Sequence, residues 1–239
     1  MKSRVRAPLQ PAFILHQRPY RDTSRLIELY TASAGRIGLV ARGSRLRGVL
    51  QPFQPLLAAW VLRGELGTLT AAEADGYWPP LRGDALLAAF YMNELLLKLT
   101  PRHDAAPALF ACYATALQAL HTASAVAPVL RIFEKDLLEL LGYGLLLEHD
   151  SSGAPVAADA WYQYAVDRGP ERLAGFQSGP LVMRGSALLA LARAELVDPE
   201  HQAAARRLLR AALDNQLAGR PLKTRELLQV LRRSPATPD

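Results

Sequence analysis

The sequence has a single cysteine, Cys112, among its 239 residues. One thiol cannot form a disulfide within the chain or supply a Cys-rich zinc site, so we expect a protein of the reducing cytoplasm. Long hydrophobic runs are also missing, because charged residues such as Lys98, Arg193 and Glu195 interrupt them. We therefore expect no transmembrane helix and no role at a membrane, and the proline-interrupted basic N-terminus argues against a signal peptide.

The patterns that mark an enzyme are scarce. The five histidines follow no metal-ligand spacing, and residues 35–38 (Gly-Arg-Ile-Gly) lack the length and the Lys-Ser/Thr ending of a phosphate-cradling loop. Acidic pairs such as Glu134 and Asp136 could hold a metal ion in a nuclease, but an ordinary helix surface explains them more simply. We expect no catalytic residues, no metal and no cofactor.

Charge is distributed unevenly along the chain. Residues 1–80 carry 11 Lys+Arg against 5 Asp+Glu, residues 81–200 carry 9 against 14, and residues 201–239 carry 8 against 3. Two basic ends flanking an acidic middle suggest nucleic acid or another anionic surface as a partner.

Residues 1–80 show the alternation and turn spacing of an all-β module. Five short segments rich in Ile, Val, Leu and Tyr predict a small closed barrel of the OB-fold type, with an SH3-like barrel as the alternative. The expected strands are Ala12–His16, Arg25–Thr31, Arg36–Arg42, Leu56–Arg63 and Thr68–Glu73.

The third of these segments is the candidate nucleic-acid site. Alternation places Arg36 and Arg42 on one face and Ile37, Leu39 and Ala41 on the other, and a Gly/Ser loop follows. Guanidinium groups there could bind phosphate oxygens, although arginines that merely protect an edge strand are an equal alternative. The DNA-binding candidates are Arg36, Arg42, loop residues Arg45 and Arg47, turn residues Arg18 and Tyr20, and an N-terminal arm with Lys2, Arg4 and Arg6.

From Asp84 onward the hydrophobic period changes to that of helices, which predicts a helical domain over residues 81–239 and an α+β multi-domain fold. Asp84 is expected to cap the first helix, the sequence Asp198-Pro199-Glu200 is expected to start a later one, and Thr224 could cap the last. An irregular region is expected from about 147 to 185. The helices are expected at Ala85–Leu99, Ala108–Leu120, Val129–Leu141, Ser186–Val197, from Asp198 to Gly219 and from Thr224 to Leu231.

Several motifs in a specific order resemble the RecO family of bacterial recombination mediators. Near the N-terminus these are residues 12–16 (AFILH), 18–20 (RPY), 23–24 (TS), 35–37 (GRI), 40–43 (VARG) and 50–53 (LQPF). Further along they are residues 91–96 (YMNELL), Arg131 before 133–134 (FE), 141–144 (LGYG) and 221–227 (PLKTREL). The resemblance extends over nearly the whole chain.

This resemblance implies an N-terminal OB-fold followed by a helical domain, in agreement with the patterns above. It also implies a non-enzymatic, cytoplasmic protein of the nucleoid that binds single- and double-stranded DNA and anneals complementary strands. Such a protein helps to load RecA, together with RecR, onto strands coated by single-stranded DNA-binding protein (SSB). Some relatives carry a four-cysteine zinc site, but the region after Leu147 has no cysteine, so we expect no zinc.

The family resemblance also implies that the acidic C-terminal tail of SSB is a partner, and we expect it to bind at Arg131. This cation lies beside apolar residues of one predicted helix, and Lys135 one turn away could attract the acidic residues of the tail. The alternative is that Arg131 pairs with Glu134 or Asp136 of its own helix.

Two other functions stay open from the residues alone. One is an RNA-binding OB-fold protein of the translation machinery. The other is a metal-dependent nuclease or other phosphoryl-transfer enzyme that uses the acidic middle of the chain. A requirement for magnesium would favour the nuclease, and a strong preference for RNA would favour the first alternative.

Overall fold

The structure of the chain is a computed structural model that describes residues 8–43, 48–62, 64 and 66–227. The chain divides into two compact units. The first unit comprises residues 1–121 and 222–239, and the second comprises residues 122–221. The helices that were expected to form one domain are thus divided between the two units. The domain boundary predicted near residue 80 stays a prediction.

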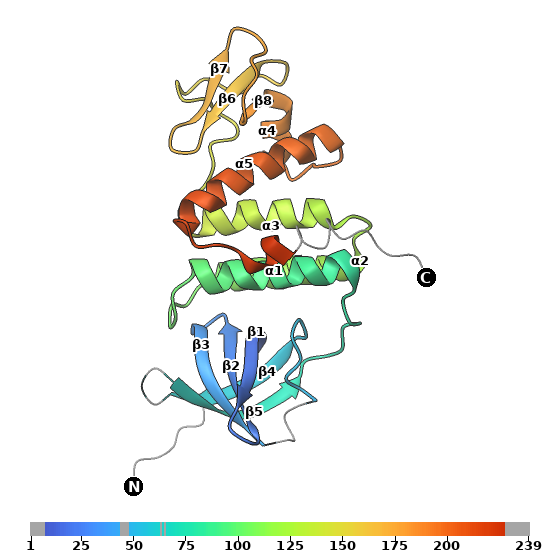
Figure 1. The fold of residues 1–239 in the computed structure, drawn as a ribbon, viewed down its shortest axis with the longest axis vertical. Helices are drawn as coiled ribbons and strands as arrows, with labels where there is room; N and C mark the ends of the chain where they lie inside the picture. The colour runs from blue at the N-terminus through green and yellow to red at the C-terminus, as the bar shows by residue number, and fades with distance from the viewer. Residues whose placement is uncertain (1–7, 44–47, 63, 65, 228–239) are drawn as a thin grey trace. The chain divides into compact units, whose positions relative to one another are not determined.

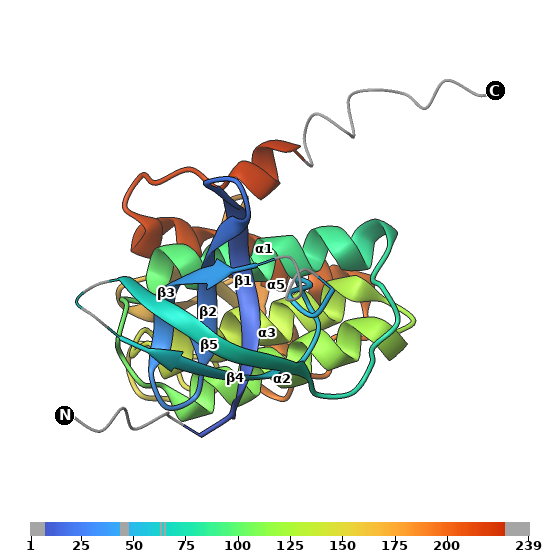
Figure 2. The same cartoon turned by 90° about the horizontal axis from the view of Figure 1, so that it is seen from below.

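The first unit contains a closed five-stranded barrel, which confirms the predicted barrel (Figure 1). Its strands are β1 (Gln10–Tyr20), β2 (Ser24–Thr31), β3 (Gly35–Arg42), β4 (Leu56–Val61) and β5 (Leu66–Ala74). They follow the order β1-β2-β3-β5-β4, and β4 pairs with β1 to close the barrel. Only the β3–β5 pairing is parallel among the barrel's strand pairs as described. Figure 2 shows the strands from below, with β4 and β5 crossing the barrel diagonally.

Alternation along the strands fills the barrel interior. Ile37, Leu39 and Ala41 of β3 are buried in the same cluster as Leu29 of β2 and Trp60 of β4. The predicted inward face of β3 is therefore confirmed. Each such side chain stabilises the fold by about 1.5–3 kcal/mol through removal of apolar surface from water.

Two helices complete the described core of the first unit: α1 (Gly83–Leu99) and α2 (Pro107–Thr122). Aromatic rings join α2 to the barrel, with Phe13 of β1 lying 5.3 Å from Tyr113 and Tyr30 of β2 lying 5.5 Å from Phe110. Buried Asn93 of α1 donates a hydrogen bond to the Leu15 carbonyl at 2.9 Å, and Tyr113 donates to its side-chain oxygen at 2.6 Å. Since buried polar groups are costly unless paired, these bonds fix how α1 meets β1.

The second unit combines helices with a small sheet. Its helices are α3 (Val126–Leu140), α4 (Gly185–Ala192) and α5 (Pro199–Leu217). Between α3 and α4 lie β6 (Trp161–Ala165), β7 (Gly169–Leu173) and β8 (Val182–Arg184), paired in the order β7-β6-β8 (Figure 1). The irregular region expected from about 147 to 185 therefore contains a three-stranded antiparallel sheet, and that part of the prediction was wrong.

Helix ends agree only in part with the sequence signals. α5 begins where expected, and Asp198 caps it, because its carboxylate accepts a hydrogen bond from the Glu200 amide at 2.7 Å. Asp84 does not cap α1, which begins at Gly83 after Arg82 and holds Asp84 inside its first turn. α3 begins at Val126 rather than at the expected Val129, and α4 ends at Ala192 rather than Val197.

The helices described within residues 8–227 are either too short or too polar to cross a lipid bilayer.

Candidate nucleic-acid interface

The outer surface of β1, β2 and β3 carries a row of basic and aromatic side chains. The strand register pairs Tyr20 with Ser24 and Ser24 with Arg42. Arg18 lies two residues before Tyr20 on β1, so its side chain is on the same outward face. Directly paired residues of antiparallel strands share a face, so these side chains point away from the barrel interior that holds Leu39. We call Arg18, Tyr20, Arg21 and Arg42 the open cationic row.

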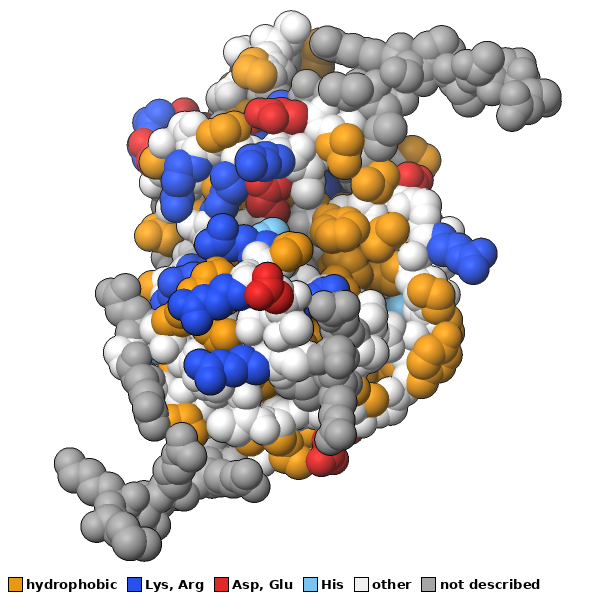
Figure 3. Space-filling view, turned by 60° about the horizontal axis from the view of Figure 1, so that its bottom comes forward, with side chains coloured by type: hydrophobic (Ala, Val, Ile, Leu, Met, Phe, Trp, Pro, Cys, Tyr) orange, Lys and Arg blue, Asp and Glu red, His pale blue; other side chains and the backbone are white. Residues whose placement is uncertain are grey.

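The open cationic row is accessible and compact. Arg18, Arg21 and Arg42 are exposed, and Tyr20 is half-buried. The Arg21 guanidinium lies 5.1 Å from the centre of the Tyr20 ring, in the range of a cation–π contact. Adjacent strands lie about 4.8 Å apart, so β1 and β3 side chains here are on the order of 10–15 Å from one another. In Figure 3 several Lys and Arg side chains gather on one side of the face drawn.

This arrangement suits a nucleic-acid backbone. Guanidinium groups can bind phosphate oxygens through two parallel hydrogen bonds, and each phosphate that they neutralise releases counterions condensed on the nucleic acid. The free face of a half-buried tyrosine offers a surface on which an unpaired base can stack. Cations from two strands beside one aromatic ring would accommodate a short, extended stretch of backbone.

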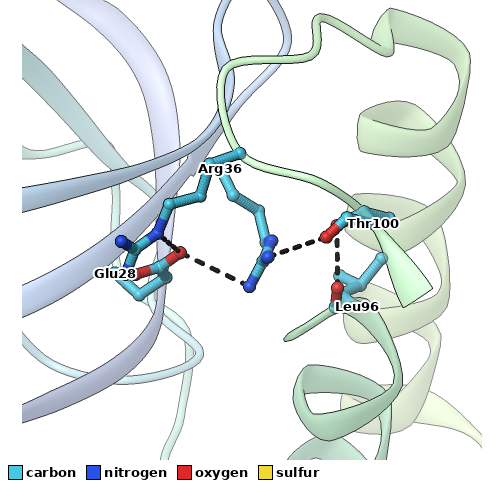
Figure 4. A network of polar contacts seen from close by, with 5 residues as sticks. Glu28, Arg36, Leu96 and Thr100 are labelled. Carbon is cyan, nitrogen blue, oxygen red and sulfur yellow. Dashed lines mark hydrogen bonds and ion pairs between the residues drawn. The ribbon is translucent and has the colours of Figure 1, made fainter. Parts of the chain in front are cut away.

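The opposite end of the same outer face is closed by a polar network (Figure 4). The Arg36 guanidinium lies 3.4 Å from the Glu28 carboxylate and donates a hydrogen bond to the Thr100 carbonyl at 2.7 Å. Arg102 binds the same carboxylate with two groups, at 3.0 and 2.6 Å. The backbone also joins here, since the His103 amide donates to the Arg36 carbonyl at 2.9 Å.

Burial changes how Arg36 must be interpreted. Its side chain is only 11% exposed, and burial lowers the pKa of its guanidinium although the Glu28 carboxylate opposes that change. Arg36 and Arg42 do share the outward face of β3, as predicted, but the segment after α1 covers only the Arg36 end. A DNA contact by Arg36 stays a prediction, and the geometry assigns this side chain to joining β2, β3 and the α1–α2 connection.

Five of the predicted DNA-binding residues lie outside the described part of the structure. They are Arg45 and Arg47 of the loop after β3, and Lys2, Arg4 and Arg6 of the N-terminal arm.

The predicted SSB-tail residues lie on α3 and are engaged within that helix. Arg131 pairs with Glu134 at 2.9 Å, and Lys135 pairs with Asp136 at 2.9 Å. The Arg131 side chain is 13% exposed and the Glu134 side chain 1%. The pairing alternative considered from the sequence is therefore present, and a tail carboxylate would have to compete with a buried one.

Three residues of this region escaped the sequence-based prediction. Arg21 lies in the turn after β1 with a φ of 54°, and the turn cluster itself was the available signal. Glu28 shares the outward face of β2 with Tyr30, the residue that pairs with Arg36, so a carboxylate diagonal to Arg36 was detectable in principle. Arg102 is 74 residues from Glu28, and no local pattern connects them.

Among the described residues, no three His, Cys, Asp or Glu side chains gather in a metal-binding arrangement.

Comparisons with known proteins agree over nearly the full length of the chain. Residues 6–77 match the family model described as Recombination protein O N terminal, and residues 81–226 match Recombination protein O C terminal. The protein named DNA repair protein RecO from Nitrosococcus oceani is 48% identical over 235 residues, which cover 96% of each chain. The one from Alkalilimnicola ehrlichii is 48% identical over 241 residues, covering 98% of this chain and 96% of the relative. The one from Pseudomonas aeruginosa is 42% identical over 231 residues, covering 96% and 98%.

Proposed function

Because this chain belongs to the RecO family, we propose that it acts in DNA repair as a non-enzymatic recombination mediator. It binds single- and double-stranded DNA, anneals complementary strands, and helps to load RecA, together with RecR, onto strands coated by SSB. This work takes place at the nucleoid in the bacterial cytoplasm. The relatives' shared name, DNA repair protein, supports the general role, and the barrel supports the contact with DNA.

The open cationic row is the observation that carries this proposal. Annealing requires two polyanions to approach, and their repulsion is the main electrostatic barrier. Arg18 and Arg42 would neutralise phosphates of a bound strand and release its counterions, which lowers that barrier without any chemical step. Tyr20 would stack on one base of the bound strand, which keeps that base from stacking on its neighbours before it pairs with a complementary strand.

The function is tested by strand annealing on complementary oligonucleotides precoated with SSB. We expect the chain to accelerate duplex formation without magnesium or nucleotide, because neutralisation and partner recruitment need neither. Product that forms only with magnesium, or that consists of shortened strands, would contradict the proposal and favour a nuclease. A strong preference for RNA over DNA of the same sequence would also contradict it.

The site is tested by the salt dependence of DNA binding. Arg18→Ala and Arg42→Ala should each weaken binding to DNA of any sequence and lower the salt slope by about one unit. The matched control is Arg168→Ala, which removes the same charge from an exposed arginine that pairs with Glu171 in the second unit. If the control and the barrel variants lower the slope equally, DNA does not contact the open cationic row specifically.

Tail capture by SSB remains part of the proposal at Arg131 and Lys135. The support for it is positional, since both cations lie on one helix beside buried Phe133 and Leu137. Binding a tail carboxylate at Arg131 would require the Glu134 carboxylate to give up its 2.9 Å contact. The family assignment supports RecR and RecA as partners only through the resemblance, and a pull-down with each purified partner tests them.

A further inference from the structure

The second unit contains a pocket of about 250 Å³ that the proposed function does not use. Residues of β6, β8, α4 and α5 line it, together with the segment between β7 and β8. All of these residues belong to the second unit, so the pocket is complete within one compact body. The aromatic and ionisable side chains of the lining are Trp161, Phe176, Arg184, Glu200, His201 and Arg207.

Small side chains keep the pocket open. Ala187 of α4 and Ala204 of α5 are both 3% exposed and line it from their helices. A larger residue at either position would occupy part of the volume. The space is smaller than the roughly 300–1,000 Å³ typical of sites for drug-sized ligands, so it suits one small group.

One wall of the pocket is aromatic and unusually exposed. Phe176 is 68% exposed and contacts Trp161 edge-to-face, with ring centres 4.8 Å apart. The Arg184 guanidinium lies 4.7 Å from the centre of the same indole ring. The ring of Phe176 is thus mostly open to solvent and offers an apolar surface that a ligand could cover.

The polar groups around this wall favour a negatively charged ligand. Arg184 and Arg207 are exposed arginines at the pocket, and His201 interacts with the Ser186 hydroxyl at 3.1 Å. Glu200 is the one carboxylate among the lining residues. A flat apolar wall next to two guanidinium groups matches a planar ring that carries a phosphate.

We propose that this pocket binds one nucleotide of a single DNA strand. The base stacks on Phe176 beside Trp161, while Arg184 and Arg207 bind the flanking phosphates. Glu200 is placed to accept a hydrogen bond from an amino group of the base. The proposal rests on the chain acting on DNA, and it adds a contact separate from the open cationic row.

A second contact on a different unit has a consequence for annealing. A chain that holds one strand on its barrel and a nucleotide of another in this pocket raises the local concentration of the second strand. Pairing then becomes a reaction within one complex, which is faster at low strand concentration.

Tryptophan fluorescence of the full-length chain tests the inference with the trinucleotide dCdCdC as the probe, because cytosine carries the amino group that Glu200 would accept from. Trp60 and Trp78 lie in the barrel unit, so the titration is made in the Arg18→Ala/Arg42→Ala background, which removes the proposed barrel contact. We expect the probe to quench emission there, and the quenching to disappear when Trp161→Phe is added. Phe176→Ala should lower the affinity for the probe at least about fivefold, because stacking of a base on one aromatic ring contributes this much or more to binding. Phe176→Tyr keeps the ring and should keep the affinity.

Phe176 is mostly exposed, so its variants should remain folded, and circular dichroism confirms this before titration. Equal probe affinity in native chain and Phe176→Ala would overturn the inference. So would quenching that persists in Trp161→Phe, or quenching of Trp161 by an acidic tetrapeptide at lower concentration than by the probe. The last result would assign the pocket to a peptide.

The barrel variants separate this inference from the proposed function. If Arg18→Ala/Arg42→Ala abolishes binding of long strands while the trinucleotide still quenches Trp161, both the row and the pocket are supported. If long strands bind and anneal normally but no probe reaches Trp161, the pocket inference fails and the proposed function stands. If neither long strands nor the probe binds, both fail.

Discussion

Replacing Arg36 by alanine separates a structural arginine from a DNA-binding one. The change removes the 3.4 Å contact to Glu28 and the 2.7 Å hydrogen bond to the Thr100 carbonyl. Both partners belong to the first unit, and the Glu28 side chain is 9% exposed, so water replaces the lost contacts poorly. We expect a loss of stability with little loss of DNA binding.

The magnitude follows from what remains around Glu28. Breaking a buried ion pair on one side costs about 3–5 kcal/mol when the other charge is left alone. Here Arg102 still binds the carboxylate at 2.6 Å, but its side chain is half exposed and its contribution is screened. We therefore expect Arg36→Ala to lower the free energy of unfolding by about 2–3 kcal/mol.

Urea denaturation and DNA-binding salt slopes measure the two effects on the same preparations. Arg42→Ala is the matched variant, because it removes the same side chain from the open end of the same strand. It should change stability by less than about 0.5 kcal/mol and lower the salt slope by about one unit. Arg36→Ala should show the opposite pattern.

A double-mutant cycle with Glu28→Gln checks the cause. Since neutral glutamine no longer needs a cation, Arg36→Ala should cost less in that background, with a coupling of about 1–2 kcal/mol. If Arg36→Ala unfolds at the native urea midpoint and lowers the salt slope, Arg36 contacts phosphate instead of holding Glu28.

Two further predictions concern other carboxylates. Although burial alone would raise it, hydrogen bonds from Thr224 and Lys223 hold the pKa of Glu94 below its usual value, so its stabilisation is present at neutral pH and lost as pH falls below about 4.3. Glu94→Gln should flatten the acid side of the stability–pH profile, and an unchanged profile would contradict this. Arg131→Ala should cost about 3 kcal/mol because buried Glu134 loses its 2.9 Å partner, and adding Glu134→Gln should recover part of that cost in urea denaturation. A native midpoint in Arg131→Ala would show instead that the cation is available for a tail carboxylate.

Much of the barrel was predictable because its signals are local. Alternation along residues 36–42 separates core from surface, and turn residues separate the strands, so neither conclusion needs a distant contact. The family resemblance, confirmed by the matching models, fixed the barrel type and the likeness to known DNA repair proteins. The cap at Asp198 was readable for the same reason, because cap, proline and acidic residue are consecutive.

The missed features depend on contacts between distant residues or on very short elements. β6 and β7 have five residues each and β8 has three, which gives too few alternations to distinguish strands from loop in a region rich in glycine and proline. Arg36 could not be assigned to Glu28 and Thr100 from its own strand, because Thr100 lies 64 residues away. The segment around Thr100 covers the Arg36 end of β3 and leaves the Arg42 end exposed, so the difference in exposure between Arg36 and Arg42 depends on that distant segment.

The contacts of Glu94 also bear on the order in which the protein forms during synthesis. Its carboxylate accepts hydrogen bonds from the Lys223 and Thr224 amides, and residues 222–239 belong to the same compact unit as the barrel. The first unit is therefore interrupted by the 100 residues of the second, from 122 to 221. At roughly 5–20 residues per second, the ribosome would need on the order of 5–20 s to make that interruption. During this time the barrel and α1 exist without the segment that satisfies Glu94, so the part made first is among the last to be completed.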